Sequence, residues 1–267
     1  MRRLGAVCRA VALIMVVTSG GAGCGWSTAS SPQAEETPGD GGAPPPGTRS
    51  SAVPAGKVAS VGVLVNGGDH SCTASVVNSP RGNVVATAAH CATGLPLDSL
   101  EFAPGFSGAG KGTFPYGKWK VRAVQVDERW TTDHEDAADY AFLTVEPDAR
   151  GRSVQSVVGS SAPEWSAGPD QRVTVVGYPD EDHNPGNRPV MCTADVHRDP
   201  DEAAMLRMEC AGFWVGTSGS PWLVDYRGPD RLGRIVGVLS GGDTDVESTA
   251  ALFDAKARSV YERATRA

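Results

Sequence analysis

Ala86-Thr87-Ala88-Ala89-His90-Cys91 decides the fold of this chain, together with two stretches that follow it. The second stretch is Ala138-Asp139-Tyr140-Ala141-Phe142-Leu143, and the third is Gly216-Thr217-Ser218-Gly219-Ser220-Pro221. The first ends a run of small and β-branched residues, the second leads into an apolar run, and the third is a glycine-rich turn. A histidine, an aspartate and a serine thus occur in this chain order, each beside a candidate strand or turn.

Short runs rich in β-branched residues surround these stretches. Gly, Pro, Asn and Asp separate the runs, and these residues favour turns. Many short strands with frequent turns predict an antiparallel sandwich or barrel. The apolar residues of the last segment recur at helical spacing instead, so we expect one amphipathic helix over residues 253–266. The expected strands are Val58–Val65, Ala74–Val77, Val84–Thr87, Trp119–Val126, Tyr140–Val145, Arg172–Gly177, Ala204–Met208, Pro221–Asp225 and Ile235–Leu239.

Composition narrows the class of protein. The 267 residues include 33 Gly and 19 Pro, a share typical of loop-rich and all-β chains. Hydrophobic residues make up 40 %, which is enough for a buried core and excludes global disorder. The formal net charge is −7. A chain this acidic binds a phosphate backbone poorly, so we expect no nucleic-acid partner.

Taken in order, the motifs T-A-A-H-C, D-x-A-x-L and G-x-S-G-[GS]-P resemble those of the trypsin/chymotrypsin-like serine proteases. The resemblance covers about residues 58–266. It implies an all-β fold of two antiparallel six-stranded β-barrels with a C-terminal α-helix, and an active site in the cleft between the barrels. On this basis barrel one spans about residues 54–150 and barrel two about residues 151–252.

The resemblance also assigns catalytic roles. A serine hydroxyl is a weak nucleophile at neutral pH and needs an adjacent base. His90 would take the proton of Ser218 and later deliver it to the leaving amine, while Asp139 would fix the imidazole tautomer. The backbone N–H groups of Gly216 and Ser218 would form the oxyanion hole.

Two further aspartates, Asp133 and Asp136, lie close enough in sequence to compete for the third role. Only Asp139 precedes the apolar Tyr-Ala-Phe-Leu run that would bury it. We therefore expect Asp139 in the triad and the other two in a solvated loop.

The substrate pocket follows less directly from the resemblance. Six residues before Ser218 stands Gly212, where the trypsin branch has an aspartate, and Phe213 follows it. Phe213 would either line the pocket or pack beneath it. The far wall would be Ser240-Gly241-Gly242, with Asp243, Asp245 and Glu247 beyond it in a solvated loop or as a negative charge for the pocket. The expected pocket residues are Gly212, Phe213, Ser240, Gly241 and Gly242.

Several positions depart from the family pattern. Thr217 stands where the trypsin branch has the aspartate that pairs with a newly cut N-terminal amine. Classical zymogen activation is therefore not expected. Ser220 and Gly177-Tyr178-Pro179 resemble the bacterial glutamyl endopeptidases, but Leu239 replaces the histidine that this branch has before its pocket wall. Glutamate specificity is therefore not expected either.

Rival hydrolase classes fail on residue order. The α/β-hydrolase fold needs its histidine after the serine, and none of the five histidines follows Ser218. A subtilisin-like site would need the order Asp, His, Ser. His134-Glu135 lacks the second histidine of the zincin motif. His70, Cys72, His90 and Cys91 could form a zinc site, but in an exported chain a disulfide between the two cysteines is the better interpretation. We expect neither a metal nor an organic cofactor.

The N-terminus is typical of an export signal. Arginines 2 and 3 precede the apolar run Ala10–Val17, which is too short to span a bilayer permanently. Ala22-Gly23-Cys24 resembles a lipobox, although Gly21 departs from it, so Cys24 is either acylated or incidental. We expect a signal peptide over residues 1–23 and a flexible linker rich in Pro, Gly and Ser over residues 24–53. The protease domain would span residues 54–267.

Four cysteines remain in the expected domain, and an exported chain favours disulfides between them. Three connectivities are possible. We favour Cys72–Cys91 and Cys192–Cys210, because each pair flanks adjacent expected strands.

The function that the sequence predicts is an exported serine endopeptidase of the bacterial secreted branch, acting on protein or peptide substrates. The alternative is a catalytically silent relative that acts as an extracellular binding protein. We expect a secreted monomer whose contact with a membrane, if any, is a lipid on Cys24.

Mass spectrometry of the mature N-terminus in the native host tests the export signal. We expect Met1 and the run Ala10–Val17 to be absent, because a signal peptidase removes them. A diacylglyceryl mass on Cys24 identifies a lipoprotein, and an unmodified terminus beyond residue 24 identifies an ordinary secreted protein. An intact Met1 contradicts both.

Overall fold

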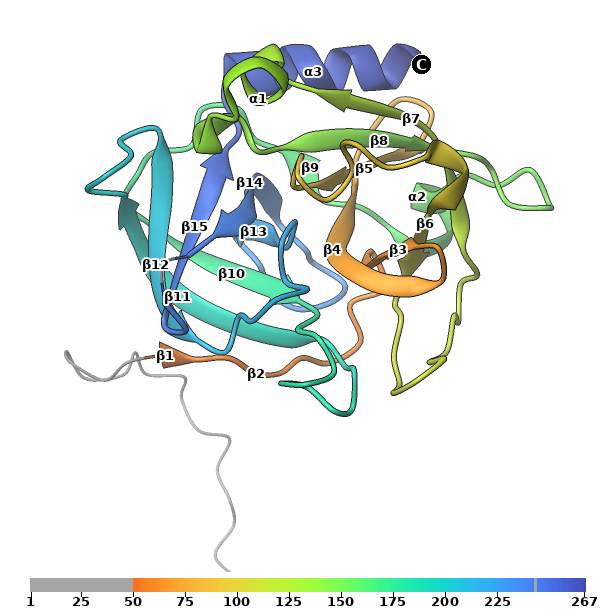
Figure 1. Cartoon of the computed structure of the whole chain (residues 1–267), viewed down its shortest axis with the longest axis horizontal. Helices are drawn as coiled ribbons and strands as arrows, with labels where there is room; N and C mark the ends of the chain where they lie inside the picture. The colour runs from red at the N-terminus through yellow and green to blue at the C-terminus, as the bar shows by residue number, and fades with distance from the viewer. Residues whose placement is uncertain (1–49, 243) are drawn as a thin grey trace, which may run out of the picture. The chain divides into compact units, whose positions relative to one another are not determined.

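Two closed β-barrels contain most strands of the computed structural model, which describes residues 50–242 and 244–267 (Figure 1). All pairings within the two barrels are antiparallel. Barrel one closes in the order β3-β4-β5-β8-β7-β6. Its strands are β3 (Val61–Asn66), β4 (Asp69–Val77), β5 (Val84–Thr87), β6 (Leu100–Pro104), β7 (Trp119–Val126) and β8 (Ala141–Val145).

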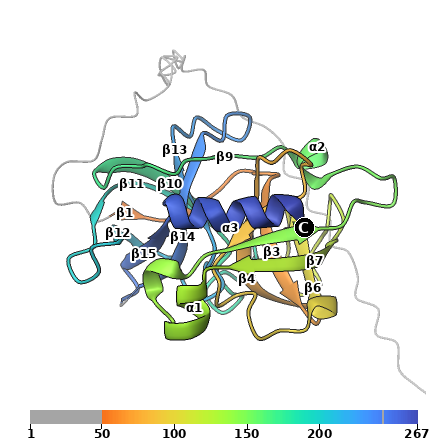
Figure 2. The same cartoon turned by 90° about the horizontal axis from the view of Figure 1, so that it is seen from above.

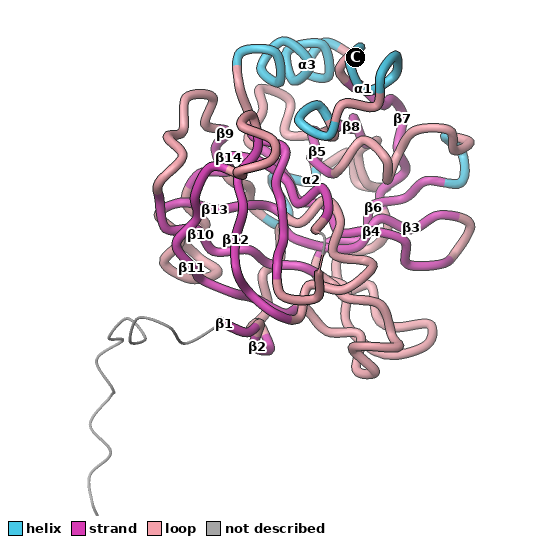
Figure 3. Tube along the Cα trace, turned by 60° about the vertical axis from the view of Figure 1, so that its left-hand side comes forward, coloured by secondary structure: helices cyan, strands magenta, loops and turns pink. Residues whose placement is uncertain are grey.

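Barrel two closes because β12 pairs with both β11 and β15. Its strands are β10 (Gln171–Gly177), β11 (Val190–Arg198), β12 (Met205–Ala211), β13 (Pro221–Val224), β14 (Arg234–Gly241) and β15 (Glu247–Leu252). The short strands β1 (Ser50–Ser51), β2 (Val53–Pro54) and β9 (Ala162–Pro163) pair with β12, β11 and β14. The predicted class of two six-stranded antiparallel barrels is confirmed, and strands dominate the regular structure (Figure 3).

Each barrel encloses its own apolar core, and a third and a fourth cluster each contain residues of both barrels. This third cluster contains Phe142 from barrel one, Ile235 from barrel two, and the buried face of α3 (Ala255–Arg266). Figure 2 shows α3 lying across both barrels. The helix begins two residues later than predicted, because the side chain of Asp254 caps it by accepting from the N–H groups of Lys256 and Ala257.

The remaining helices are short. They are α1 (Glu128–Asp133), α2 (Val154–Val158) and the 3-10 turns η1 (Leu97–Ser99) and η2 (Asp136–Ala138). Within the described residues, no helix is long and apolar enough to cross a membrane. The expected signal peptide, Cys24 and the linker up to residue 49 lie outside the described residues. In the part of the chain that the structure describes, the first strand begins at Ser50, three residues before the predicted end of the linker.

Both predicted disulfides are confirmed. Cys72 in β4 is bonded to Cys91 in the turn after β5, and their Cα atoms lie 6.1 Å apart. Cys192 in β11 is bonded to Cys210 in β12, with a Cα separation of 6.7 Å. The first disulfide thus joins β4 to the turn that follows its neighbour β5, and the second joins the paired strands β11 and β12.

A buried carboxylate fixes the start of α1. Asp127 is the N-cap of this helix and accepts from the N–H of Arg129. Its Oδ2 also accepts from Tyr140 Oη at 2.7 Å and from Arg129 Nη2 at 3.0 Å. Burial by itself raises the pKa of Asp127, but the hydrogen bonds from Arg129 and Tyr140 outweigh it and lower the pKa to about 2.

The depressed pKa of Asp127 predicts a loss of stability in acid. The stabilisation is fully present above the unfolded pKa near 4 and is lost as pH falls through the folded pKa, a contribution of about 2 kcal/mol. Urea unfolding between pH 5 and pH 2 measures it. Asp127→Asn removes this part of the pH dependence, whereas Asp230→Asn, at an exposed aspartate, retains it. Equal pH slopes in wild type and Asp127→Asn contradict the prediction.

Candidate active site

His90 and Asp139 meet at the rim of barrel one. His90 lies in the turn after β5, and Asp139 directly follows η2, two residues before the start of β8. Asp139 Oδ2 lies 2.7 Å from His90 Nδ1, and Oδ1 accepts from the backbone N–H of His90 at 2.9 Å. The carboxylate is 2 % exposed and the imidazole 38 % exposed. A carboxylate facing Nδ1 favours the tautomer with its proton on Nδ1, which leaves Nε2 free to accept one.

The other two aspartates do not reach this position. Asp133 ends α1 and Asp136 begins η2, and both are exposed. Within the described residues, only Asp139 hydrogen bonds to His90.

Ser240 belongs to the same cluster, which sequence reasoning did not foresee. Its Oγ donates to Asp139 Oδ2 at 2.6 Å. Ser240 is also one of the expected pocket residues, and its side chain faces the carboxylate of Asp139. Because Ser240 lies at the end of β14 in barrel two, this hydrogen bond joins the two barrels.

The turn before Ser218 has a conformation that requires glycine. The N–H of Thr217 donates to the carbonyl of Trp214 at 3.1 Å, which closes a four-residue turn over residues 214–217. Gly216, the third residue of this turn, has φ +94°, as a type II turn demands. A Cβ at Gly216 would also lie 2.7 Å from the carbonyl oxygen of Tyr178.

Hydrogen bonds to two carbonyls set the direction of the N–H groups in this segment. Val215 O accepts from the N–H of Asp180 at 2.7 Å, and Thr217 O accepts from Ser220 N at 3.0 Å and Ser220 Oγ at 2.6 Å. The C=O and N–H of a trans peptide point in opposite directions. The N–H groups of Gly216 and Ser218 therefore point away from these donors. Neither donates to another group of the described residues.

Close backbone contact brings Ser218 to His90. The carbonyl of Ser218 accepts from the N–H of Thr73 at 2.8 Å. A Cβ at Gly219 would lie 2.2 Å from Thr73 O and 2.9 Å from Ala88 N, so only glycine fits there. Ser218 thus lies against the turn that carries His90. Within the described residues its hydroxyl makes no hydrogen bond to the imidazole, a bond that in catalytic serines often tightens only when substrate binds.

The expected pocket residues are spread over four environments. Gly212 has φ +102° and faces Ala52, with 3.2 Å between a Cβ built on it and the Cβ of Ala52. Phe213 is half-buried and packs against the core of barrel two. Gly241 and Gly242 are exposed at the end of β14. Of the set, only Ser240 contacts the His90–Asp139 pair through a hydrogen bond.

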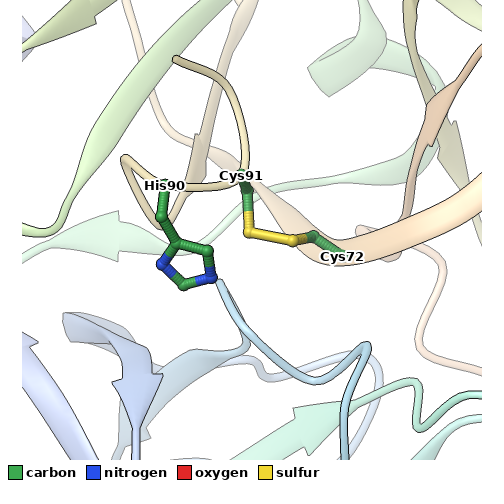
Figure 4. A group of neighbouring side chains, drawn as sticks. All are labelled: Cys72, His90 and Cys91. Carbon is green, nitrogen blue, oxygen red and sulfur yellow. A yellow bond between two sulfur atoms is a disulfide. The ribbon is translucent and has the colours of Figure 1, made fainter. Parts of the chain in front are cut away.

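One group of potential metal ligands lies at the site. Sγ of Cys72, Sγ of Cys91 and the imidazole of His90 lie within 4.8 Å of one another. Figure 4 shows the His90 ring beside the disulfide that joins these two cysteines. Because the sulfurs are bonded to each other, neither offers the thiolate that a zinc site needs.

Comparisons with known proteins agree with this fold. The family model described as Trypsin matches residues 48–260. The chain is similar to the protease Anisep from Arthrobacter nicotinovorans, with 23 % identity, a TM-score of 0.70, and coverage of 82 % of this chain and 100 % of Anisep. It is also similar to the thermostable serine protease AL20 from an extremophilic microorganism, with 24 % identity, a TM-score of 0.69, and coverage of 78 % and 98 %.

A Glu endopeptidase is a more distant match, with 14 % identity, a TM-score of 0.63, and coverage of 82 % of this chain and 98 % of that protein. No curated protein matches the chain by sequence. The chain belongs to the trypsin family.

The environment of Thr217 predicts activity without a particular N-terminus. Thr217 is buried, and its hydroxyl donates to Trp214 O at 2.7 Å. An ammonium group buried beside it would lack a countercharge, which is costly. We expect chains that begin at residues 25, 35 and 45 to have the same kcat/KM on a peptide substrate. A steep gain in kcat/KM at one starting residue contradicts this.

Proposed function

We propose that this protein is an exported serine endopeptidase that cleaves peptide bonds through His90, Asp139 and Ser218. The observation that carries the proposal is the hydrogen-bonded chain from Ser240 through Asp139 to His90, next to the turn that presents Ser218. Export is supported by the two disulfides, since such bonds persist in oxidising compartments. Residues 1–23 would direct export, and the chain from residue 24 to the first strand at Ser50 would be a tether.

In the first half of the reaction, His90 Nε2 takes the proton of Ser218 Oγ as this oxygen attacks the scissile carbonyl. The developing oxyanion accepts hydrogen bonds from the N–H groups of Gly216 and Ser218. Losing one such donor typically costs about 3–4 kcal/mol of transition-state stabilisation. His90 then passes the proton to the leaving amine, and the acyl group stays on Ser218.

In the second half, His90 takes a proton from water, and the resulting hydroxide attacks the acyl-enzyme. The proton returns to Ser218 Oγ as the acid product leaves. Asp139 stays ionised throughout and stabilises the imidazolium. Its hydrogen bond from Ser240 satisfies a second acceptor site on Oδ2 and leaves both bonds to His90 intact.

Ser218→Ala tests the proposal. The variant keeps every backbone hydrogen bond of the turn, so we expect an unchanged melting temperature. Without the nucleophile, kcat on a peptide falls by about 10⁴-fold or more. Labelling by a fluorophosphonate, which reacts only with an activated serine, is abolished.

Ser166→Ala, at a serine distant in sequence from the three motifs, is the matched control and retains both labelling and turnover. A wild-type protein that is folded but neither labels nor cleaves peptides identifies the silent binding protein instead. Undiminished turnover in Ser218→Ala excludes Ser218 as the nucleophile.

A further inference from the structure

Thr73 in β4 touches both residues that carry the proposed oxyanion hole. Its backbone N–H donates to Ser218 O at 2.8 Å, and its Oγ1 donates to Gly216 O at 3.0 Å. The same Oγ1 accepts from the N–H of Tyr178 at 2.9 Å. Thr73 is fully buried. A single residue of barrel one therefore holds two residues of barrel two.

The direction of these hydrogen bonds is fully determined. The Tyr178 N–H can only donate and the Gly216 carbonyl can only accept, while a hydroxyl does both. The hydroxyl proton of Thr73 must therefore point at Gly216 O. These two hydrogen bonds allow only one orientation of the Thr73 hydroxyl, so Thr73 holds the Gly216 carbonyl in a fixed position.

Gly216 is held on both of its peptide planes. Asp180 N–H fixes the carbonyl of the preceding residue, Val215, and Thr73 Oγ1 fixes the carbonyl of Gly216 itself. Glycine at φ +94° has no side chain to restrict it, so these two hydrogen bonds are what define its orientation. The first bond aims the Gly216 N–H, and the second fixes the Cα from which that N–H extends.

We propose that Thr73 is a positioning residue that orients the Gly216 turn for catalysis, in place of the buried ion pair that a carboxylate at position 217 would form. The inference rests on the proposed protease function. Thr73 does not touch the reacting atoms and acts only through Gly216 and Ser218. Its hydroxyl is neutral and belongs to the folded barrel, so it needs no cleaved N-terminus.

Removal of the hydroxyl leaves the buried Tyr178 N–H unpaired. The Gly216 carbonyl loses its bond from Thr73 and, among the described residues, keeps only His70 as a neighbouring donor. Unsatisfied buried groups drive local rearrangement. Rotation of the Gly216 carbonyl toward another donor would tilt the turn and move its N–H away from the oxyanion. The loss should then appear in the transition state and not in the binding of substrate.

Thr73→Val, which keeps the shape and removes the hydroxyl, is the principal test. We expect kcat on a peptide substrate to fall roughly 10- to 100-fold, less than for outright loss of an oxyanion donor, with KM little changed. Affinity for a peptide aldehyde, which forms the tetrahedral adduct, falls by the same factor as kcat/KM. Thr73→Ser retains the hydroxyl and restores kcat to near the wild-type value.

Thr144→Val is the matched control. Thr144 is also a buried threonine of barrel one, and its Oγ1 donates to Ala264 O at 2.9 Å, away from the site. The Thr144→Val variant should have a lower melting temperature than the wild type and an unchanged kcat. If Thr73→Val does not fold, Thr73→Ala replaces it with the same expected loss of kcat.

Four outcomes separate the two hypotheses. A wild-type kcat in folded Thr73→Val or Thr73→Ala overturns the role of Thr73, as does a Thr73→Ser as slow as Thr73→Val. An equal loss of kcat in Thr144→Val also overturns it, because the effect is then general destabilisation. A wild type that fails to label with fluorophosphonate overturns the protease function itself.

Discussion

The buried carboxylate of Asp139 is the constraint on which the rest of the site depends. An ionised group removed from water must be paired or hydrogen-bonded, or it destabilises the fold. Asp139 meets this demand with the imidazole and backbone N–H of His90 and the hydroxyl of Ser240. These donors come from the turn after β5 in barrel one and from the end of β14 in barrel two. The hydrogen bonds that stabilise the Asp139 carboxylate thus fix the tautomer of His90 and also hold the two barrels in their relative position.

A second constraint is steric and acts on Ser218, the proposed nucleophile. Gly219 approaches the backbone of Thr73 and Ala88 so closely that no side chain fits, and Ser218 is carried against barrel one as a result. Neutral hydroxyls, those of Thr73, Thr217 and Ser220, then accept or donate the hydrogen bonds that shape this turn. The electrostatic contact through Asp139 and the steric contact through Gly219 converge on the same junction between the barrels.

Much of this could be predicted from sequence, for identifiable reasons. Two strands were predicted with their observed bounds: β5, which begins with two consecutive valines, and β7, which has valines at positions 121, 124 and 126. The barrel strands that were missed are β6, β11 and β15. β6 and β15 contain at most one β-branched residue each, and β15 (Glu-Ser-Thr-Ala-Ala-Leu) is held by pairing with β12 and β14 on either side. His90, Asp139 and Ser218 lie in motifs and could be named. Ser240 and Thr73 act through contacts across the barrel junction, which no local pattern encodes.

The Cys72–Cys91 disulfide connects the strand that contains Thr73 to the turn that contains His90. Cys72 precedes Thr73 and Cys91 follows His90, so one covalent bond ties the strand that supports Gly216 to the turn that carries the imidazole. Closing this loop restricts the unfolded chain and favours the arrangement in which both residues are in place. Because the bond forms only under oxidising conditions, the compartment that oxidises Cys72 and Cys91 is also the one in which Thr73, the proposed support of the oxyanion hole, and His90, the proposed base, are held together.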